Sequence, residues 1–153
     1  MRALEPDDWQ VYREIRLAML ADSPEAFASR YEDVVRRDET EWRRVLTDCD
    51  HFLAEQDGAT VGGAGLVEHE GELNLIGMYV VPDHRGGPAA TLLVAAVADR
   101  ARARGGRRVL LDVVIGNDRA RRFYERCGFV PTGRTQVVPG RVSDLEVQMA
   151  LAL

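Results

Sequence analysis

Lysine is absent from this chain of 153 residues, and all 20 of its basic residues are arginine. The absence excludes Schiff-base catalysis, which needs a lysine amine, and it excludes the lysine of a Walker A nucleotide-binding loop. The arginines do not make the chain basic, because 25 acidic residues give a net charge of −5. A general nucleic-acid binder needs a basic face, so we expect no nucleic-acid partner.

Metal ligands and long apolar runs are also scarce. The two cysteines, Cys49 and Cys127, form no metal-ligand pattern, and the three histidines have no companions at ligand spacing. We therefore expect no metal site. No apolar run reaches the roughly 20 residues of a membrane helix, and the first residues lack the apolar core of a signal peptide. The sequence therefore predicts a cytoplasmic protein without a membrane partner.

Hydrophobic residues make up 46% of the chain, which is enough for a buried core. Its length suits one domain, which we expect to span residues 1–153. Periodicity and turn residues predict strands at 2–4, 51–55, 60–68, 73–81, 109–115, 129–138 and 142–153, with helices after Pro6, over 25–37, near 40–43, after Arg85 and after Asn117. The predicted fold class is α/β, with a mixed sheet of about seven strands and the order β-α-α-β-β-β-α-β-α-β-β.

The stretch Leu73–Phe129 reads as strand, glycine-containing turn, helix, strand and helix. A helix that begins directly after a strand directs several unpaired N–H groups and its positive dipole end toward one point, which favours an anion. The turn therefore predicts a phosphate or pyrophosphate site. The alternative is an ordinary strand-to-helix turn, because short glycine motifs are weak evidence.

Two spaced motifs in this stretch carry a family resemblance. The matching residues are Val80, Pro82, Arg85, Ala90, Asn117, Ala120, Tyr124, Gly128 and Phe129. The pattern resembles the core of the GCN5-related N-acetyltransferase (GNAT) superfamily. The second motif, from Asn117 to Phe129, matches at every spaced position. The first departs at Pro88, which stands where the family usually has a glycine.

The resemblance implies an N-acetyltransferase with acetyl-CoA as cosubstrate. The acceptor would be a primary amine of a small molecule, peptide or protein, attacking directly in a ternary complex. The residues that would bind the coenzyme are Met78, Val80, Arg85, Gly86, Gly87, Ala89, Ala90, Thr91, Asn117 and Tyr124. The alternative is a non-catalytic acyl-CoA-binding or regulatory domain. Two departures from the family pattern favour it: Pro88 in the turn, and the absence of the glutamate that some members carry on the strand before it.

The resemblance also implies a general acid. A tyrosine hydroxyl can give or share the proton that a departing thiolate needs, and Tyr124 occupies the family's position for that role. Without the motif, Tyr124 reads as a core aromatic residue. Some family members use a glutamate as general base at the position that Asn74 occupies here. We therefore name Glu72, which lies two residues earlier on the same face of the strand, as the general base. Glu32, Asp33, His84 and a chain of water molecules are the alternatives.

The acceptor site and the oligomeric state are less constrained by the sequence. The second helix and the last hairpin usually shape the acceptor site in the GNAT family, and Phe27, Tyr31, Glu32 and Trp42 are the predicted acceptor contacts. The last strand, at 142–153, would leave an apolar edge if it were unpaired. A homodimer formed through the C-terminal strands is therefore one expectation.

Overall fold

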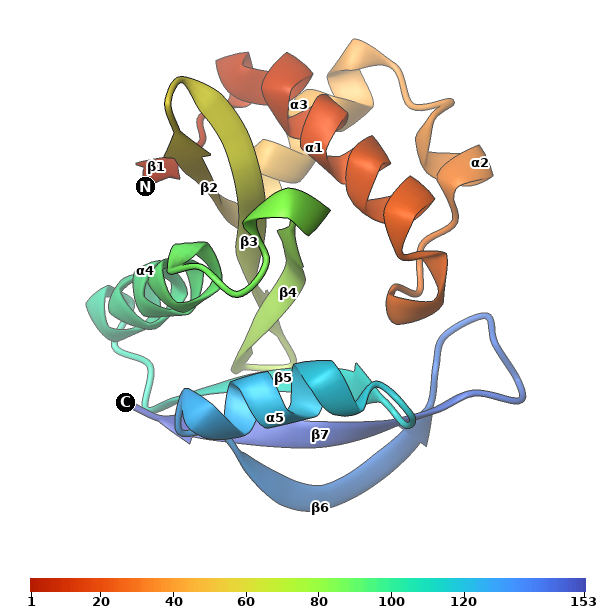
Figure 1. Cartoon of the computed structure of the whole chain (residues 1–153), viewed down its shortest axis with the longest axis vertical. Helices are drawn as coiled ribbons and strands as arrows, with labels where there is room; N and C mark the ends of the chain where they lie inside the picture. The colour runs from red at the N-terminus through yellow and green to blue at the C-terminus, as the bar shows by residue number, and fades with distance from the viewer.

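The sheet of this protein has seven strands in the order β1-β2-β3-β4-β5-β7-β6, as the computed structural model of residues 1–153 shows (Figure 1). The strands are β1 Arg2–Ala3, β2 Asp50–Gln56, β3 Ala59–His69, β4 Glu72–Val80, β5 Arg108–Val114, β6 Val130–Val137 and β7 Leu145–Ala152. Neighbouring strands are antiparallel except β4 and β5. The predicted mixed α/β sheet and its order of elements are confirmed.

Helices lie on the sheet in two groups (Figure 1). The helices are α1 Trp9–Asp22, α2 Tyr31–Val34, α3 Glu39–Asp48, α4 Ala89–Ala103 and α5 Asp118–Arg126, with short 3-10 turns at Pro6–Asp8, Pro24–Ala26 and Pro82–His84. One hydrophobic core packs residues of α1, α2 and α3 against β2 and β4. A larger one packs α4 and α5 against the middle of the sheet. None of the helices is both long and apolar enough to cross a membrane.

The predicted helix over residues 25–37 is wrong. Only Tyr31–Val34 is helical there, and Phe27 is extended at φ −126° and ψ 144°. The cause lies far along the chain, because Arg141 donates hydrogen bonds to the carbonyls of Pro24, Glu25 and Phe27. Carbonyls engaged by this side chain do not build an α-helical ladder. The segment instead runs as a loop beside the connection between β6 and β7.

Strands β4 and β5 separate at one end, which opens the centre of the molecule. Their parallel pairing is confined to Asn74 and Leu110. Farther along, Gly77 takes a φ of +58°, a backbone conformation that favours glycine, and the β3–β4 register shifts nearby. In Figure 1, β4 turns away from β5 and leaves a gap that faces α5.

The outer strand β6 leaves several hydrophobic side chains in solvent. Val130 and Val137 are exposed, and Val142 in the loop after β6 is 93% exposed. The last strand is not an apolar edge as expected, because β7 pairs with both β5 and β6 and the edge strand is β6. A homodimer formed through the C-terminal strands remains a prediction.

Candidate functional site

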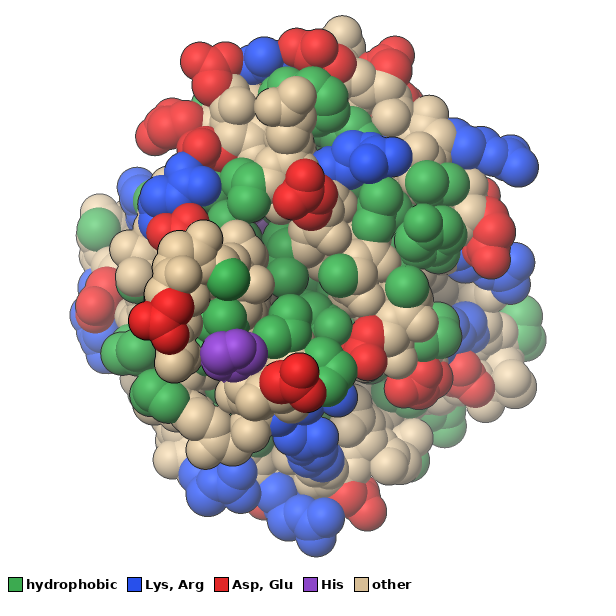
Figure 2. Space-filling view, turned by 45° about the horizontal axis from the view of Figure 1, so that its top comes forward, with side chains coloured by type: hydrophobic (Ala, Val, Ile, Leu, Met, Phe, Trp, Pro, Cys, Tyr) green, Lys and Arg blue, Asp and Glu red, His purple; other side chains and the backbone are tan.

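A cleft of about 1200 Å³ occupies the place where β4 and β5 separate. It is lined by the end of β4, the turn into α4, one side of α4, the β5–α5 loop, α5 and the segment from Ser23 to Phe27. Figure 2 shows hydrophobic side chains gathered in a hollow at the middle of one face, with charged side chains around it. Its volume exceeds that of a typical pocket for a drug-sized ligand, so it suits a large, extended one.

Most of the residues predicted to bind the coenzyme meet in this cleft. Met78, Val80, Arg85, Gly86, Gly87, Ala90, Thr91, Asn117 and Tyr124 all line it. Ala89 does not, because its side chain is buried in the core. Residues from four separate segments of the chain thus converge on one space.

The first turn of α4 directs free backbone donors into the cleft. The first backbone hydrogen bond of the helix runs from Leu92 N–H to Pro88 O at 3.0 Å. The N–H groups of Ala89, Ala90 and Thr91 therefore have no carbonyl partner within the helix. Pro88 is the N-cap residue and does not line the cleft. The turn thus has the donors and the dipole end that an anion needs.

Strand β4 supplies a backbone donor on the side of the gap. Val81 N–H binds Val61 O on β3 at 2.9 Å. Since backbone groups alternate in direction along a strand, the N–H and C=O of Val80 point away from β3. The Val80 carbonyl accepts a hydrogen bond from Arg85 Nε at 2.9 Å, whereas β5 has moved out of reach of the N–H. This N–H can donate to a ligand in the gap.

Arg85 links the end of β4 to the end of α1 through contacts with both. Besides its bond to Val80, its guanidinium forms an ion pair with Asp22, and it lies 5.6 Å from the centre of the Tyr79 ring. The Ser23 hydroxyl and Arg85 together lower the pKa of Asp22. Much of the donor capacity of Arg85 is therefore engaged within the protein, so its first role is to position β4.

Tyr124 lies on α5, on the side of the helix that faces the cleft. It is 8% exposed, and its ring packs edge-on against Phe129 at 5.5 Å between ring centres. Burial raises the pKa of Tyr124 well above its ordinary value, so the hydroxyl keeps its proton. Asn117 caps the same helix, with Oδ1 accepting from Ala120 N–H at 3.3 Å. The cap fixes where α5 begins and hence where Tyr124 points.

This geometry coincides with a family match. The model of the acetyltransferase (GNAT) family matches residues 12–129, which is most of the chain. The chain belongs to the GNAT family. The match covers both motifs of the cleft and the helices α1 and α3 that pack beside it.

Similar proteins and solved structures differ in how much of their own length this chain covers. It is 34% identical over 137 residues to the mycothiol acetyltransferase of Thermobispora bispora, covering 84% of this chain and 45% of that protein. The chain spans about half the length of the curated relatives it matches. The structure of ribosomal-protein-alanine N-acetyltransferase from Brucella melitensis has a TM-score of 0.76 at 25% identity, covering 99% of this chain and 98% of that one. A Salmonella typhimurium structure solved with its cofactor acetyl-CoA has a TM-score of 0.75 at 23% identity, covering 99% and 92%.

The four predicted acceptor contacts do not lie together in the structure. Of the four predicted residues, only Phe27 lines the cleft. Trp42 is 0% exposed, and its Nε1–H donates to Arg37 O at 3.1 Å inside the core. Tyr31 and Glu32 are exposed on α2 and do not line the cleft. The structure therefore does not bring these three side chains to the site.

Glu72 also lies outside the cleft. It begins β4 and forms an ion pair with Arg108, which lowers the pKa of its carboxyl group. A strand rises about 3.3 Å per residue, so Glu72 lies roughly 20 Å from Met78. At that distance it cannot take a proton in the cleft. Among the alternatives, His84 lines the cleft, and so do three carboxylates that the sequence did not single out, Glu25, Asp99 and Asp144.

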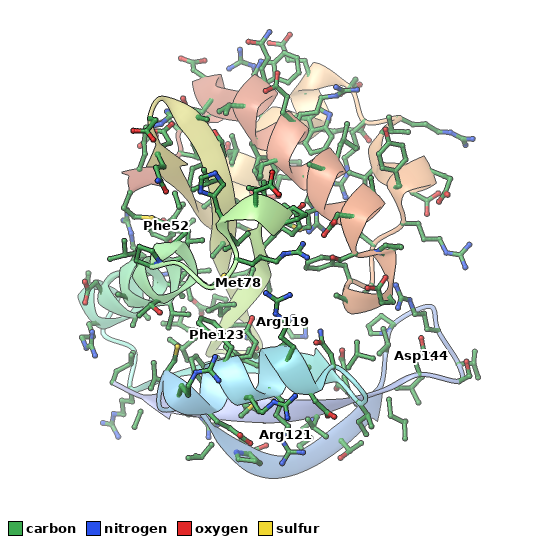
Figure 3. All side chains as sticks on the ribbon, in the orientation of Figure 1. Phe52, Met78, Arg119, Arg121, Phe123 and Asp144 are labelled. Carbon is green, nitrogen blue, oxygen red and sulfur yellow. The ribbon has the colours of Figure 1, made fainter.

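Two arginines on α5 are further site residues that the sequence analysis missed. Arg119 and Arg126 line the cleft together with Phe123, and neither forms an ion pair. Figure 3 shows Met78, Arg119 and Phe123 in the gap between β4 and α5, with Arg121 on the opposite side of the helix. Helical spacing relates these positions, since Arg119, Phe123 and Arg126 stand at i, i+4 and i+7 and therefore share one face of α5. Free cations at this place suit the phosphates of a nucleotide.

We expect Arg119→Gln to weaken CoA binding roughly three- to tenfold, because it removes an exposed charge from the cleft without changing the backbone. Isothermal titration with CoA measures the effect, which should shrink as salt is added. Arg121→Gln is the matched control, since Arg121 lies on the far side of α5 (Figure 3). Equal affinities for the two variants would remove Arg119 from the coenzyme site.

Proposed function

We propose that this protein transfers an acetyl group from acetyl-CoA to a primary amine of a small molecule, peptide or protein. The observation that carries the proposal is the continuous cleft from the first turn of α4, along the separated end of β4, to Tyr124. It offers donors for a pyrophosphate at one end and a protonated tyrosine hydroxyl at the other. The GNAT membership of the chain supports this assignment.

The proposed reaction is a direct attack in a ternary complex. The N–H groups at the start of α4 hold the pyrophosphate, and the arm of the coenzyme lies along β4 in the gap beside β5. The amine nitrogen attacks the thioester carbon, and Val80 N–H donates to the oxygen as negative charge develops there. The carbon–sulfur bond then breaks, and the leaving thiolate receives a hydrogen bond or the proton from Tyr124. The products are an amide and free CoA.

The acceptor must lose protons during this reaction. Glu25, His84, Asp99 and Asp144 line the cleft and are the candidate proton acceptors, with water molecules as the other carrier. Glu72 is not part of this proposal.

Acetyl-CoA and CoA should each raise the melting temperature, whereas ATP at the same concentration should not. A ligand that binds only the folded state stabilises it by about 2.7 kcal/mol at 100 times its dissociation constant. Differential scanning fluorimetry measures the shifts. No shift at millimolar acetyl-CoA would remove the cofactor from the proposal.

Turnover is tested separately by following free thiol with a panel of amines. Release of CoA that depends on the amine supports the transferase. Binding of acetyl-CoA without turnover on any amine would favour the non-catalytic acyl-CoA-binding domain instead.

A further inference from the structure

A second, smaller cavity of about 190 Å³ lies beside the cleft. It is enclosed by α1, α3 and strands β2, β3 and β4, and it shares no lining residue with the cleft. Most of its wall is apolar, with polar groups from Tyr12, Arg16, Arg37, Cys49 and His51. The function proposed above makes no use of this cavity.

The cavity holds positive charge without a balancing anion. Arg16 is half-buried, and its guanidinium contacts only Met19 Sδ and Ser29 Oγ, each at 3.0 Å, and the face of Phe27. Arg37 lies over the Trp42 ring at 5.5 Å. No ion pair of the structure includes Arg16 or Arg37. Taking a guanidinium out of water without an anion is unfavourable, so a bound anion would relieve it.

His51 is the second sign that a ligand is missing. It is 6% exposed, and its Nε2 is the only buried side-chain nitrogen or oxygen atom without a hydrogen-bond partner. Its ring packs against Tyr12 at 4.5 Å between ring centres. Burial, with a smaller contribution from the charge of Arg16, lowers the pKa of His51 to about 4, so the ring is neutral. A neutral imidazole can donate one hydrogen bond to an anion in the cavity.

The cavity reaches the point of β4 where the proposed reaction takes place. Ile76 and Gly77 line the cavity, and Met78, the next residue, lines the cleft. A Cβ atom on Gly77 would lie 3.6 Å from Arg16 Nη1, so the guanidinium sits directly at the kink of the strand. Phe27, whose ring lies 5.8 Å from the Arg16 guanidinium, lines the cleft as well. Arg16 therefore lies between the smaller cavity, which it lines, and the cleft, which its neighbour Phe27 lines.

We propose that the cavity at Arg16 binds a carboxylate of the acceptor, so that the preferred acceptor is a small molecule carrying both an amine and an acidic group. Arg16 is the specificity-determining residue, with Arg37 and His51 as its supporting donors. At about 30 Å³ per water molecule, the volume accommodates a carboxylate with a short carbon chain. This inference rests on the proposed function, because it assigns the acceptor of the same reaction.

The kinetic test compares alanine with alaninamide, which is nearly the same size and lacks the carboxylate. The wild-type kcat/KM should be at least about tenfold higher for alanine, as expected for one charge-assisted contact. Arg16→Gln should abolish this preference by lowering kcat/KM for alanine at least about tenfold. Arg36→Gln removes a charge from an exposed neighbour that does not line the cavity, and it should keep the preference. A wild-type enzyme that prefers alaninamide, or a preference that survives in Arg16→Gln, would overturn the proposal.

A second measurement needs no activity. Acetate, compared with chloride at equal ionic strength, should raise the melting temperature of the wild type and shift the Hε1 resonance of His51 in the NMR spectrum. Arg16→Gln should melt no lower than the wild type without ligand, because it removes an unbalanced cation, and it should show neither acetate effect. Both acetate effects without acetylation of any amine would keep the anion site and refute the proposed transferase. Acetyl-CoA binding and amine acetylation without any effect of acetate would keep the proposed transferase and refute the anion site. An acetate shift that persists in Arg16→Gln would mean that acetate binds elsewhere, which would also refute the anion site.

Discussion

Tyr124→Phe should lower kcat about 10²–10³-fold and leave the dissociation constant of acetyl-CoA within about twofold. The ring keeps its edge-on contact with Phe129, so only the hydroxyl is lost. Because burial raises the pKa of Tyr124, this hydroxyl is protonated at neutral pH and can donate to the departing thiolate. An interaction made only in the transition state appears in kcat and not in ground-state binding. Steady-state kinetics and isothermal titration measure the two quantities.

Tyr31→Phe is the matched control for this variant. Tyr31 also loses a hydroxyl, but it is exposed on α2 and outside the cleft, so its kcat should equal that of the wild type. An unchanged kcat in Tyr124→Phe would make Tyr124 a packing residue. A drop in kcat together with a large loss of acetyl-CoA affinity would make its hydroxyl a binding group.

The cap of α5 and the unpaired N–H groups at the start of α4 could be predicted from the sequence, because local rules determine them. Asn117 caps α5 through a bond to Ala120 three residues later, and Tyr124 follows at a fixed helical angle. The donors at the start of α4 likewise follow from a helix that begins after a strand. Residues that are close in the sequence are enough to form these features.

Two of the differences between prediction and structure depend on partners far along the chain. Arg141 binds the carbonyl of Glu25, 116 residues away, and replaces the predicted helix by a loop. Arg108 lies 36 residues from Glu72 and marks the end of β4 that is remote from the cleft. The absence of an ion pair at Arg16 could not be predicted either, because the sequence does not tell which carboxylates lie near this guanidinium in the fold.

An inward-facing aromatic residue is a further source of error. Helical periodicity tells which side of α3 faces the protein, but it does not distinguish a core from a cleft. Trp42 is a predicted acceptor contact because of the GNAT resemblance, and the structure places it in the core with Tyr12, at 5.8 Å between ring centres. The two roles predict different consequences for one substitution.

Trp42→Ala should lower the free energy of unfolding by about 3–5 kcal/mol, because it leaves a large cavity among fully buried side chains. It also removes the donor of the bond to Arg37 O. Urea unfolding followed by circular dichroism measures the loss. Trp42→Phe should lose less than the alanine variant, since it fills part of the cavity.

Trp9→Ala is the control, because the other tryptophan of the chain is half-buried and should lose clearly less stability. The kinetics of the protein that remains folded separate the two roles of Trp42. A core residue should leave the KM for the acceptor within about twofold once activity is scaled to the folded fraction. If instead the KM for the acceptor rose strongly while stability stayed near that of the wild type, Trp42 would contact the acceptor, and the cleft would have to extend into the space between α1 and α3.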